Sequence, residues 1–449
     1  MDSLIEYKID KDFDKNEYYY FFTLLNNRFE IINDYLAKNL ERRFNKKFKP
    51  IYILQAKRNS FFKQDNYIIL NHNLKKIQKQ MKIKRLIYLQ DLEDLNLEFA
   101  NSSLIKKITK KLVRKQNIIF MISFTSFGLD KIHPKIINIG PDASVVNKYE
   151  NKIEQIKLFK RLNLPLNETK IYKNVYLLLK DKKVNYPIYI SPSYTSGGHE
   201  SKIAFCRDDI IKFKNQLRPC NKKEKIFVSK FIKNIKLSPN GTAIVIGKNK
   251  TVPMLISDQI LRNNIHLGNL YPSKTSKKNQ KQIINTLIKI GNFLSLRGFK
   301  GLFGCDFIID DKDNCFVIDL NPRRQSGYLP LLLMSKKIDI LNLEVNLALN
   351  QKIPKISYSD FQCNFSWGHS KIKPYSEYSK LKKEIKINSV ETPFLNIGKR
   401  FICSYFPKGY ILNGGYCGYY IITHQNSNKI ISKIKIEVNK LINQICESV

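Results

Sequence analysis

The sequence predicts an α/β protein with an N-terminal open α/β domain, a central region of mixed helices and strands, and a C-terminal region of strands and one helix. Three observations support this fold class. β-rich runs alternate with helical stretches over the first 140 residues, which is typical of an open α/β sheet. Two apolar runs flank a polar turn at 310–314, which predicts a hairpin. In the last hundred residues, glycines stand between aromatic runs.

The composition is that of a folded protein with several domains. The 449 residues suffice for two to four domains, and 43% of them are hydrophobic and can fill the cores. Lys and Arg outnumber Asp and Glu by 78 to 38, which gives a net charge of +40, but 64 of the basic residues are Lys. Because Arg is the side chain that contacts phosphate and guanine in bidentate fashion, a dispersed Lys excess favours compositional bias over a nucleic-acid partner.

The sequence carries no signal for export or membrane insertion. The first twenty residues include acids and no apolar core segment, so we expect no secretory leader. The longest apolar stretch, near 118–129, is interrupted by Ser and Thr and is shorter than the roughly 20 residues that span a bilayer. The eight Cys form no CxxC pair, which favours reduced thiols in a cytoplasmic protein.

Residues 1–143 are predicted to form the N-terminal α/β domain. Helical periodicity covers 20–46 and 102–115, and strand-like runs lie at 50–54, 67–70, 85–89, 117–123 and 135–139. No GxGxxG motif follows the first strand, so a dinucleotide-binding fingerprint is absent. Gly140 and Pro141 mark the end of this domain.

Three further segments complete the predicted organisation. The segment 144–225 has a helix over 144–162 and a strand over 186–192. The segment 226–350 contains a strand near 225–232, a helix over 278–296 and the hairpin. The segment 351–449 has aromatic strands and ends with a helix over 429–446.

The hairpin carries the most informative side chains of the sequence. Asp306 lies in its first strand, and Asp319 and Asn321 lie on one face of the second. Because paired strands place opposite residues side by side, we expect the two carboxylates to face each other. Carboxylate and amide oxygens are the ligands that Mg²⁺ prefers, with phosphate oxygens in the remaining positions. Arg323 and Arg324 follow directly and could neutralise anionic groups.

The pattern from Asp306 to Asp319, Asn321, Pro322 and Arg323 resembles the metal-binding hairpin of the ATP-grasp superfamily of ligases. The resemblance covers roughly 145–335. It implies that 1–143 is an open α/β pre-ATP-grasp domain. It also implies that 144–225 and 226–350 are the small (lid) and large subdomains of the ATP-grasp fold, both α+β, and that 351–449 is an α+β extension domain.

The resemblance also implies a set of ATP-binding residues. Lys152 stands where the family has a lysine that reaches the nucleotide phosphates. The segment after the strand at 186–192 is similar to the flexible glycine loop over the phosphates, and 225–232 is similar to the hinge that contacts adenine through its backbone. The loop and hinge residues implied by the resemblance are Thr195, Ser196, Gly197, Gly198, His199, Ser229, Lys230, Phe231 and Ile232.

Ser191 is a departure from the family pattern, because it stands where a second phosphate-binding lysine is usual. Lys202, just beyond the glycine loop, is expected to substitute for that lysine. The alternative is that the loop binds phosphate through backbone N–H groups and hydroxyls alone.

By resemblance, the reaction is ATP-dependent activation of a carboxylate to an acyl phosphate, followed by attack of an amine. ATP and Mg²⁺, with Mn²⁺ as an alternative metal, are the implied cofactors. Arg323 is the expected catalytic cation, since a fixed positive charge stabilises the tetrahedral centre. The residues expected to line the substrate sites are Arg324, Ser326, Gly327, Asp258 and Gln259.

The implied partners are a small carboxylic acid and an amine such as an amino acid or peptide, without a membrane or nucleic acid. A homodimer is common among such enzymes. Three alternatives stay open at this point: a carboxylate–thiol ligase, a carboxylase of the same superfamily, and a weakly catalytic ATP-binding module whose basic surface contacts nucleic acid.

Overall fold

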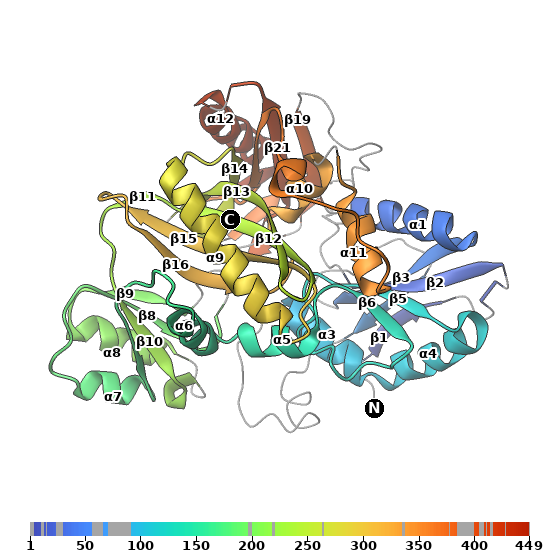
Figure 1. Ribbon diagram of the computed structural model, residues 1–449, viewed down its shortest axis with the longest axis horizontal. Coiled ribbons are helices and arrows are strands. Elements are labelled where there is room, and N and C mark those ends of the chain that lie inside the picture. Colours follow the sequence, from blue (N-terminus) through green and yellow to red (C-terminus); the bar gives the residue numbers. More distant parts are fainter. Residues whose placement is uncertain are drawn as a thin grey trace.

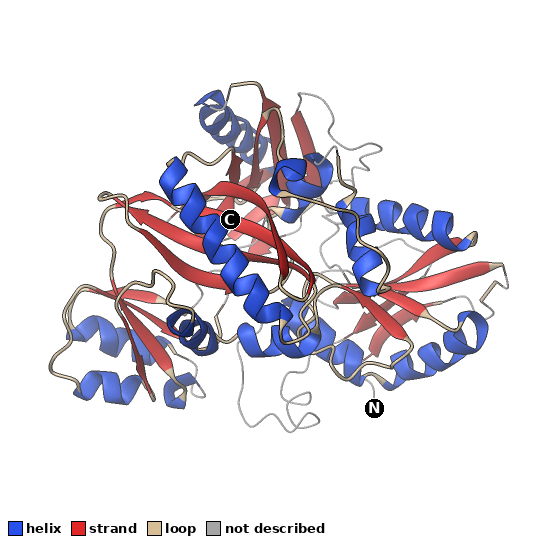
Figure 2. Cartoon of the chain, in the orientation of Figure 1, coloured by secondary structure: helices blue, strands red, loops and turns tan. Residues whose placement is uncertain are grey.

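The computed structural model describes the chain in segments, which Figures 1 and 2 show in one orientation. The described residues are 4–9, 13–14, 16–23, 30–55, 66–70, 91–195, 200–217, 221–262, 265–334, 337–376, 378–383, 399–403, 408–409, 411–413, 416–426 and 428–448. The N-terminal sheet lies to the right in Figure 1, a small sheet to the lower left, and a large sheet between them. The mixed α/β architecture confirms the predicted fold class.

The N-terminal unit is a six-stranded sheet in the order β1-β4-β3-β2-β5-β6. The pairs from β4 to β6 are parallel, and only β1 runs antiparallel to its neighbour β4. Its elements are β1 (Leu4–Lys8), β2 (Glu17–Phe22), α1 (Glu30–Phe44), β3 (Lys47–Gln55), β4 (Tyr67–Leu70), α3 (Asp91–Asn101), α4 (Ser103–Gln116), β5 (Ile119–Ile122) and β6 (Ile136–Ile139).

The predicted helix over 20–46 is partly wrong. Its first residues belong to β2, a central strand whose Tyr20 and Phe21 have no exposed surface, and α1 begins only at Glu30. Aromatic side chains favour a strand that is buried on both faces, and this tertiary burial outweighs the helical pattern. The strand expected at 85–89 lies outside the described residues.

The small unit is a four-stranded sheet in the order β7-β10-β8-β9. Ile188, Ile190, Ile226 and Val228 lie in one apolar core together with residues of α7 and α8. Its elements are β7 (Thr169–Tyr172), α7 (Val175–Lys180), β8 (Ile188–Pro192), β9 (Lys202–Ala204), α8 (Arg207–Gln216), a 3-10 turn (Asn221–Lys223) and β10 (Ile226–Lys230). The helices α5 (Ala143–Tyr149) and α6 (Lys152–Arg161) precede them in the chain and contribute apolar side chains to the core of the large sheet.

The single helix expected over 144–162 is two helices. The Asn151 side chain accepts hydrogen bonds from the backbone N–H groups of Ile153 and Glu154, so that α6 begins at Lys152. Such a capping side chain satisfies the free donors of a helix start. The break places Lys152 in the first turn of a new helix.

The large unit is a nine-stranded sheet that runs β11-β15-β12-β13-β14-β17-β21-β19, with β16 paired to β15. Its first elements are β11 (Ile235–Leu237), β12 (Pro239–Gly247), β13 (Lys250–Arg262), β14 (Ile265–Tyr271), α9 (Lys277–Ser295), β15 (Gly301–Asp310), β16 (Cys315–Asn321), α10 (Tyr328–Met334) and α11 (Ile340–Ala348).

The last hundred residues continue this sheet. β17 pairs with β14, so the expected division at residue 350 does not coincide with a break between sheets. A second sheet joins β20, β18 and β22. The elements are a 3-10 turn (Tyr358–Phe361), β17 (Ser366–Lys371), β18 (Tyr378–Leu381), β19 (Lys399–Cys403), β20 (Ile411–Asn413), β21 (Gly418–His424), α12 (Asn428–Ile445) and β22 (Cys446–Ser448).

One face of the nine-stranded sheet is covered by helices. A Cβ atom at Gly241 would lie 2.9 Å from Leu287 of α9, and one at Gly368 would lie 2.7 Å from Ile430 of α12. The pairing of β12, β13, β14 and β17 places Gly241 and Gly368 on the same face. The neighbouring residues along each strand therefore point to the opposite face, which we call the polar face.

Candidate functional site

The polar face begins at the predicted hairpin of β15 and β16. Asp306 pairs with Asp319, as expected from the sequence, and Gly304 pairs with Asn321. Beyond Asp306 the pairing skips Ile318, whose side chain is 41% exposed. Such a bulge re-aims the side chains next to it.

Asp306 is held by three amide side chains. Its Oδ1 accepts from Asn240 Nδ2 at 2.5 Å and from Gln259 Nε2 at 2.9 Å, and its Oδ2 accepts from Asn321 Nδ2 at 3.2 Å. Burial and the neighbouring Asp319 raise the pKa of Asp306 to about 6. A buried carboxylate beside another is costly unless a cation is present.

Lys152 supplies a cation at this place. Its Nζ forms an ion pair with Asp319 Oδ1, and the two side chains are 12% and 25% exposed. The backbone N–H of Lys152 donates to the carbonyl oxygen of Ser193 at 2.8 Å, which ties the start of α6 to the end of β8.

The donor set fits a hard divalent cation. Asp306, Asp319 and Asn321 come from two adjacent strands and offer carboxylate and amide oxygens, the chemistry that Mg²⁺ prefers. Among the described residues, no three His, Cys, Asp or Glu side chains form a metal-binding group. The fit therefore depends on the Asn321 amide as the third protein ligand.

Arg323 lies beside this centre in a second ion pair. Its Nε donates to Glu150 Oε1 at 2.9 Å, with side-chain exposures of 12% and 13%. Its guanidinium carbon lies 5.4 Å from the centroid of the Phe124 ring, which belongs to the N-terminal unit. The cation is thus oriented from two sides.

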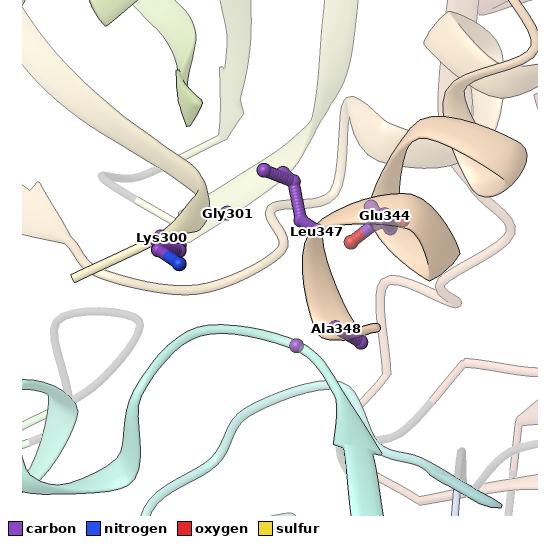
Figure 3. Close-up of a pocket in the computed structure, with 6 residues that line it drawn as sticks. Lys300, Gly301, Glu344, Leu347 and Ala348 are labelled. Carbon is purple, nitrogen blue, oxygen red and sulfur yellow. The ribbon is translucent and has the colours of Figure 1, made fainter. Parts of the chain in front are cut away.

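Arg324 corrects an expectation, because it has no surface for a substrate. It is 1% exposed, donates to the carbonyl oxygens of Ser123 and Ile139, and lies 2.7 Å from Glu344 of α11. Figure 3 shows Glu344 beside a cavity at this junction. The cavity has about 30 Å³ of free space, room for one water molecule rather than a substrate. Arg324 therefore joins the N-terminal and large units.

Gln325 and Ser326 fix the same loop on the sheet. Gly304 leaves room for Gln325, since a Cβ atom at Gly304 would lie 1.8 Å from Gln325 Oε1. Ser326 Oγ donates to Asn269 Oδ1 at 3.2 Å and lies 3.3 Å from His266 Nε2. At Gly327, an added Cβ atom would meet nothing within 4 Å. Arg324, Gln325 and Ser326 thus hold the loop that carries Arg323.

Asn269 organises the far end of the polar face. Its Nδ2 donates to Ser257 Oγ at 3.0 Å, its Oδ1 lies 3.0 Å from His266 Nε2, and its backbone N–H donates to His369 Nδ1 at 3.2 Å. Since Nδ1 of His369 accepts, a neutral ring carries its proton on Nε2, which is buried without a partner in the described structure.

Burial keeps both histidines at this end uncharged. Burial and then Lys371 lower the pKa of His266 to about 3. Burial, with His266 and Lys371, holds the pKa of His369 well below its usual value. Lys371 Nζ donates to the carbonyl oxygen of His266 at 3.0 Å. The far end therefore offers neutral hydrogen-bonding groups beside one lysine.

Asp258 and Gln259 are neighbours with different surroundings. Gln259 contacts Asp306 on the polar face, as described above. Asp258 lies on the helix-covered face, where it accepts from Ser273 Oγ at 2.6 Å and from the backbone N–H of Lys274 at 2.7 Å. The expected substrate role of Asp258 is corrected: the carboxylate holds the connection between β14 and α9.

Lys202 is the second correction in the nucleotide region. The pairing of β8 and β9 places Lys202 opposite Ile190, whose side chain lies in the core with α7 and α8. Ser191 points to the other face of this sheet, where its Oγ accepts from Ser201 Oγ at 2.9 Å. Lys202 therefore does not replace the missing lysine next to Ser191.

The other expected nucleotide contacts are only partly described. Thr195 is the last described residue before the glycine loop, and Ser196, Gly197, Gly198 and His199 lie outside the described residues.

In the hinge, Ser229 Oγ lies 2.8 Å from Thr169 Oγ1, and the backbone N–H of Phe231 donates to the Pro187 carbonyl at 3.1 Å. Adenine binding by Ser229, Lys230, Phe231 and Ile232 stays a prediction.

Glu150, Asn240 and Asn269 are site residues that were not predicted from the sequence. Asn240 stands between Pro239 and Gly241, a turn-like run that hides the start of β12, whereas Asn269 is recognisable as a polar residue inside β14. Such positions are costly without partners. No local signal pairs Glu150 with Arg323, because the two are 173 residues apart.

Comparison with known proteins places the site within a family domain. Residues 149–327 match the model of the ATP-grasp domain. The carbamoyl phosphate synthase large chain of Pyrococcus furiosus is 25% identical over 245 residues, which cover 51% of this chain and 22% of that protein. The C-terminal section of the same enzyme from Methanocaldococcus jannaschii is 25% identical over 228 residues, 49% of this chain and 35% of that protein.

The chain thus spans about a fifth of the length of the first curated relatives that it matches.

Solved structures show the same fold over nearly the whole chain. A biotin carboxylase from Campylobacter jejuni has a TM-score of 0.67 at 14% identity and covers 96% of this chain and 92% of that one. An N5-carboxyaminoimidazole synthase from Aspergillus clavatus has a TM-score of 0.60 at 12% identity and covers 96% and 100%. In the described part of the chain, no helix is long and apolar enough to cross a membrane.

Proposed function

The chain contains an ATP-grasp domain, and from this premise we propose that it is an ATP-dependent ligase that joins a carboxylic acid to an amine. The single observation that carries the proposal is the pair of facing carboxylates, Asp306 and Asp319, next to Lys152 and Arg323. In this reaction a carboxylate oxygen attacks the γ-phosphorus of ATP, and ADP leaves. The amine then attacks the acyl carbon, and phosphate leaves.

Asp306, Asp319 and Asn321 would hold Mg²⁺, which neutralises phosphate charge when it is bound. Lys152, in the first turn of α6 and paired with Asp319, would contact the nucleotide phosphates. Arg323 is oriented by Glu150 and Phe124 and would stabilise the negative charge of the acyl phosphate and of the tetrahedral centre.

The second substrate is proposed to bind on the polar face beyond Arg323. Ser326 follows Arg323 by three residues and contacts His266 and Asn269. The space beside the Cα atom of Gly327 is open, since a Cβ atom there would meet nothing within 4 Å. Neutral imidazoles, amides and hydroxyls there hydrogen-bond without adding charge. This arrangement suits an amine, which must be uncharged when it attacks.

A carboxylase reaction is the second candidate. It is favoured by two solved structures that share the fold, a biotin carboxylase and an N5-carboxyaminoimidazole synthase. In that case bicarbonate would replace the organic acid as the group that ATP activates.

We further propose a cytoplasmic location and a homodimer. Another fold relative, a 2-oxoglutarate carboxylase domain of Hydrogenobacter thermophilus, is described as a dimer (TM-score 0.66, 14% identity). Analytical ultracentrifugation tests the dimer, and a monomer at micromolar concentration would contradict it.

An ATP-to-ADP assay tests the proposed reaction. The purified chain is incubated with Mg²⁺, ATP and pooled small acids and amines, with and without bicarbonate, and products are detected by mass. ADP formation that requires an acid and an amine supports the ligase. Dependence on bicarbonate alone supports the carboxylase, and AMP formation contradicts both.

A further inference from the structure

One loop carries two opposite charges that both pair with the end of β16. Glu150 at the end of α5 binds Arg323, and Lys152 at the start of α6 binds Asp319. The charges alternate along both segments, because negative Glu150 precedes positive Lys152 and negative Asp319 precedes positive Arg323. The loop is thus fixed on β16 by charge at two points.

Contacts that do not involve the Lys152 ammonium also hold α6 on β16. The Gln155 side chain donates to the Leu320 carbonyl at 2.7 Å and accepts from the Leu320 N–H at 3.0 Å. The backbone of Lys152 is bonded to Ser193, and Asn151 caps the helix. The flexible Lys152 side chain can therefore leave Asp319 without displacing the helix.

The Lys152 ammonium and a divalent cation compete for the same place. Lys152 Nζ contacts Asp319 Oδ1, and Asp319 is one of the two carboxylates that would bind the metal. Two positive charges at contact distance on one carboxylate repel each other strongly in a partly buried site.

We propose that Lys152 is the counter-cation of Asp319 in the nucleotide-free protein, and that nucleotide phosphates draw Lys152 away and so free Asp319 for the metal. This inference rests on the metal assignment of the proposed function. Its consequence is coupling: nucleotide strengthens metal binding, and by thermodynamic reciprocity metal strengthens nucleotide binding. Free Mg²⁺ alone binds weakly, because it must first displace Lys152.

Binding of Mn²⁺, followed by electron paramagnetic resonance without turnover, tests the proposal. In the absence of nucleotide, Lys152→Met is expected to bind Mn²⁺ about tenfold more tightly than the parent, because a charged contact worth about 1.4 kcal/mol no longer has to be broken. Addition of ADP should then tighten Mn²⁺ binding less in Lys152→Met than in the parent.

Two further variants act as controls. Lys157 lies on the same helix, and its side chain is 54% exposed and pairs with Glu154 at 2.6 Å. Lys157→Met should therefore leave Mn²⁺ binding unchanged. Lys152→Arg keeps the charge and should keep the weak Mn²⁺ binding of the parent. It also tests the proposal if Lys152→Met does not fold.

The outcomes separate the inference from the proposed function. Equal Mn²⁺ affinity in the parent and Lys152→Met, or tighter binding in Lys152→Arg, overturns the competition and leaves the ligase proposal in place. Absence of Mn²⁺ binding in the parent and in Lys152→Met, even with ADP, overturns the metal site and with it both proposals.

Discussion

The two ends of the polar face differ in the kind of titratable group that they bury, carboxylates at the hairpin end and histidines at the far end. At the hairpin end, Asp306 and Asp319 are paired with amides and with Lys152, and burial raises the pKa of Asp306 to about 6. At the far end, burial lowers the pKa of His266 to about 3, and a network around Asn269 holds neutral rings.

The comparison shows that one physical factor, loss of water, acts on both ends. It favours the uncharged form of an acid and of an imidazole alike. The hairpin end therefore needs a cation to stay ionised and is suited to metal and phosphate. The histidines of the far end stay neutral by themselves, so that this end is suited to an uncharged nucleophile.

The largest effect is expected for Asp319→Asn at the hairpin end. The change removes a charged ligand and leaves Lys152 without its counter-ion, so ADP formation should fall by roughly a hundredfold or more. Circular dichroism should show an intact fold. Asp313→Asn, on the exposed turn of the same hairpin, is the matched control. ADP release within about threefold of the parent would disprove the metal assignment.

Arg323→Ala is expected to lower kcat by about tenfold to a hundredfold while the KM for ATP changes much less. The charge that Arg323 meets exists mainly in the acyl phosphate and the tetrahedral centre. Steady-state kinetics at varied ATP measures both constants. A normal kcat with a large rise in the KM for ATP would show that Arg323 is a ground-state nucleotide contact.

Asn240→Ala and Asn269→Ala compare the two ends directly. Each removes a buried amide, and each should lower the free energy of unfolding by about 1–3 kcal/mol, because its partners lose a hydrogen bond. Only Asn240→Ala should also weaken Mn²⁺ binding, since Asn240 orients Asp306. Urea unfolding and a Mn²⁺ titration measure the two effects, and weaker Mn²⁺ binding in Asn269→Ala alone would reverse the assignment.

The two ends should respond to pH with opposite sign. Folding lowers the pKa of His266 from 6.5 to about 3, because the buried ring binds a proton less readily than in the unfolded chain. His266 therefore costs no stability above pH 6.5, and the free energy of unfolding decreases as the pH falls from 6.5 towards 3. The pKa of Asp306 is raised from 3.8, so stability is lost as the pH rises from 3.8 through about 6.

Metal-free urea unfolding between pH 4 and 8 tests this contrast. Compared with the parent, His266→Gln should lose less stability on acidification, and Asp306→Asn should lose less on the rise from pH 4 to 6. Unchanged pH profiles in both variants would contradict the burial argument.

The smallest effect is expected for Lys202→Ala. Its side chain lies on the helix-covered face of the small sheet, so the activation free energy of ATP turnover should change by less than about 0.5 kcal/mol. A loss of tenfold or more in kcat/KM for ATP would show that Lys202 reaches the phosphates after all.

The parts predicted from sequence are those fixed by local spacing. Asp306 and Asp319 face each other because a short turn sets the register of one hairpin, and the polar residues inside its apolar strands are visible in the sequence. Lys152 is predicted through a family pattern, and Asn151, which caps the start of α6, is itself a local signal.

The parts that were missed depend on pairing between distant segments. Whether Asp258 or Gln259 contacts Asp306 is decided by which face of β13 each occupies, and that follows from pairing with β12. The same holds for Lys202, whose face is set by β8. The burial of Arg324 requires the N-terminal unit, and no pattern within its own loop indicates it.

The central claim is that a carboxylate attacks ATP and leaves its oxygen on phosphate. The most direct measurement uses acids labelled with ¹⁸O in the carboxylate, with ATP, Mg²⁺ and pooled amines, followed by mass analysis of the released phosphate. We expect ADP and phosphate that carries one ¹⁸O atom in each product-forming turnover. Unlabelled phosphate, or AMP with pyrophosphate, would contradict it.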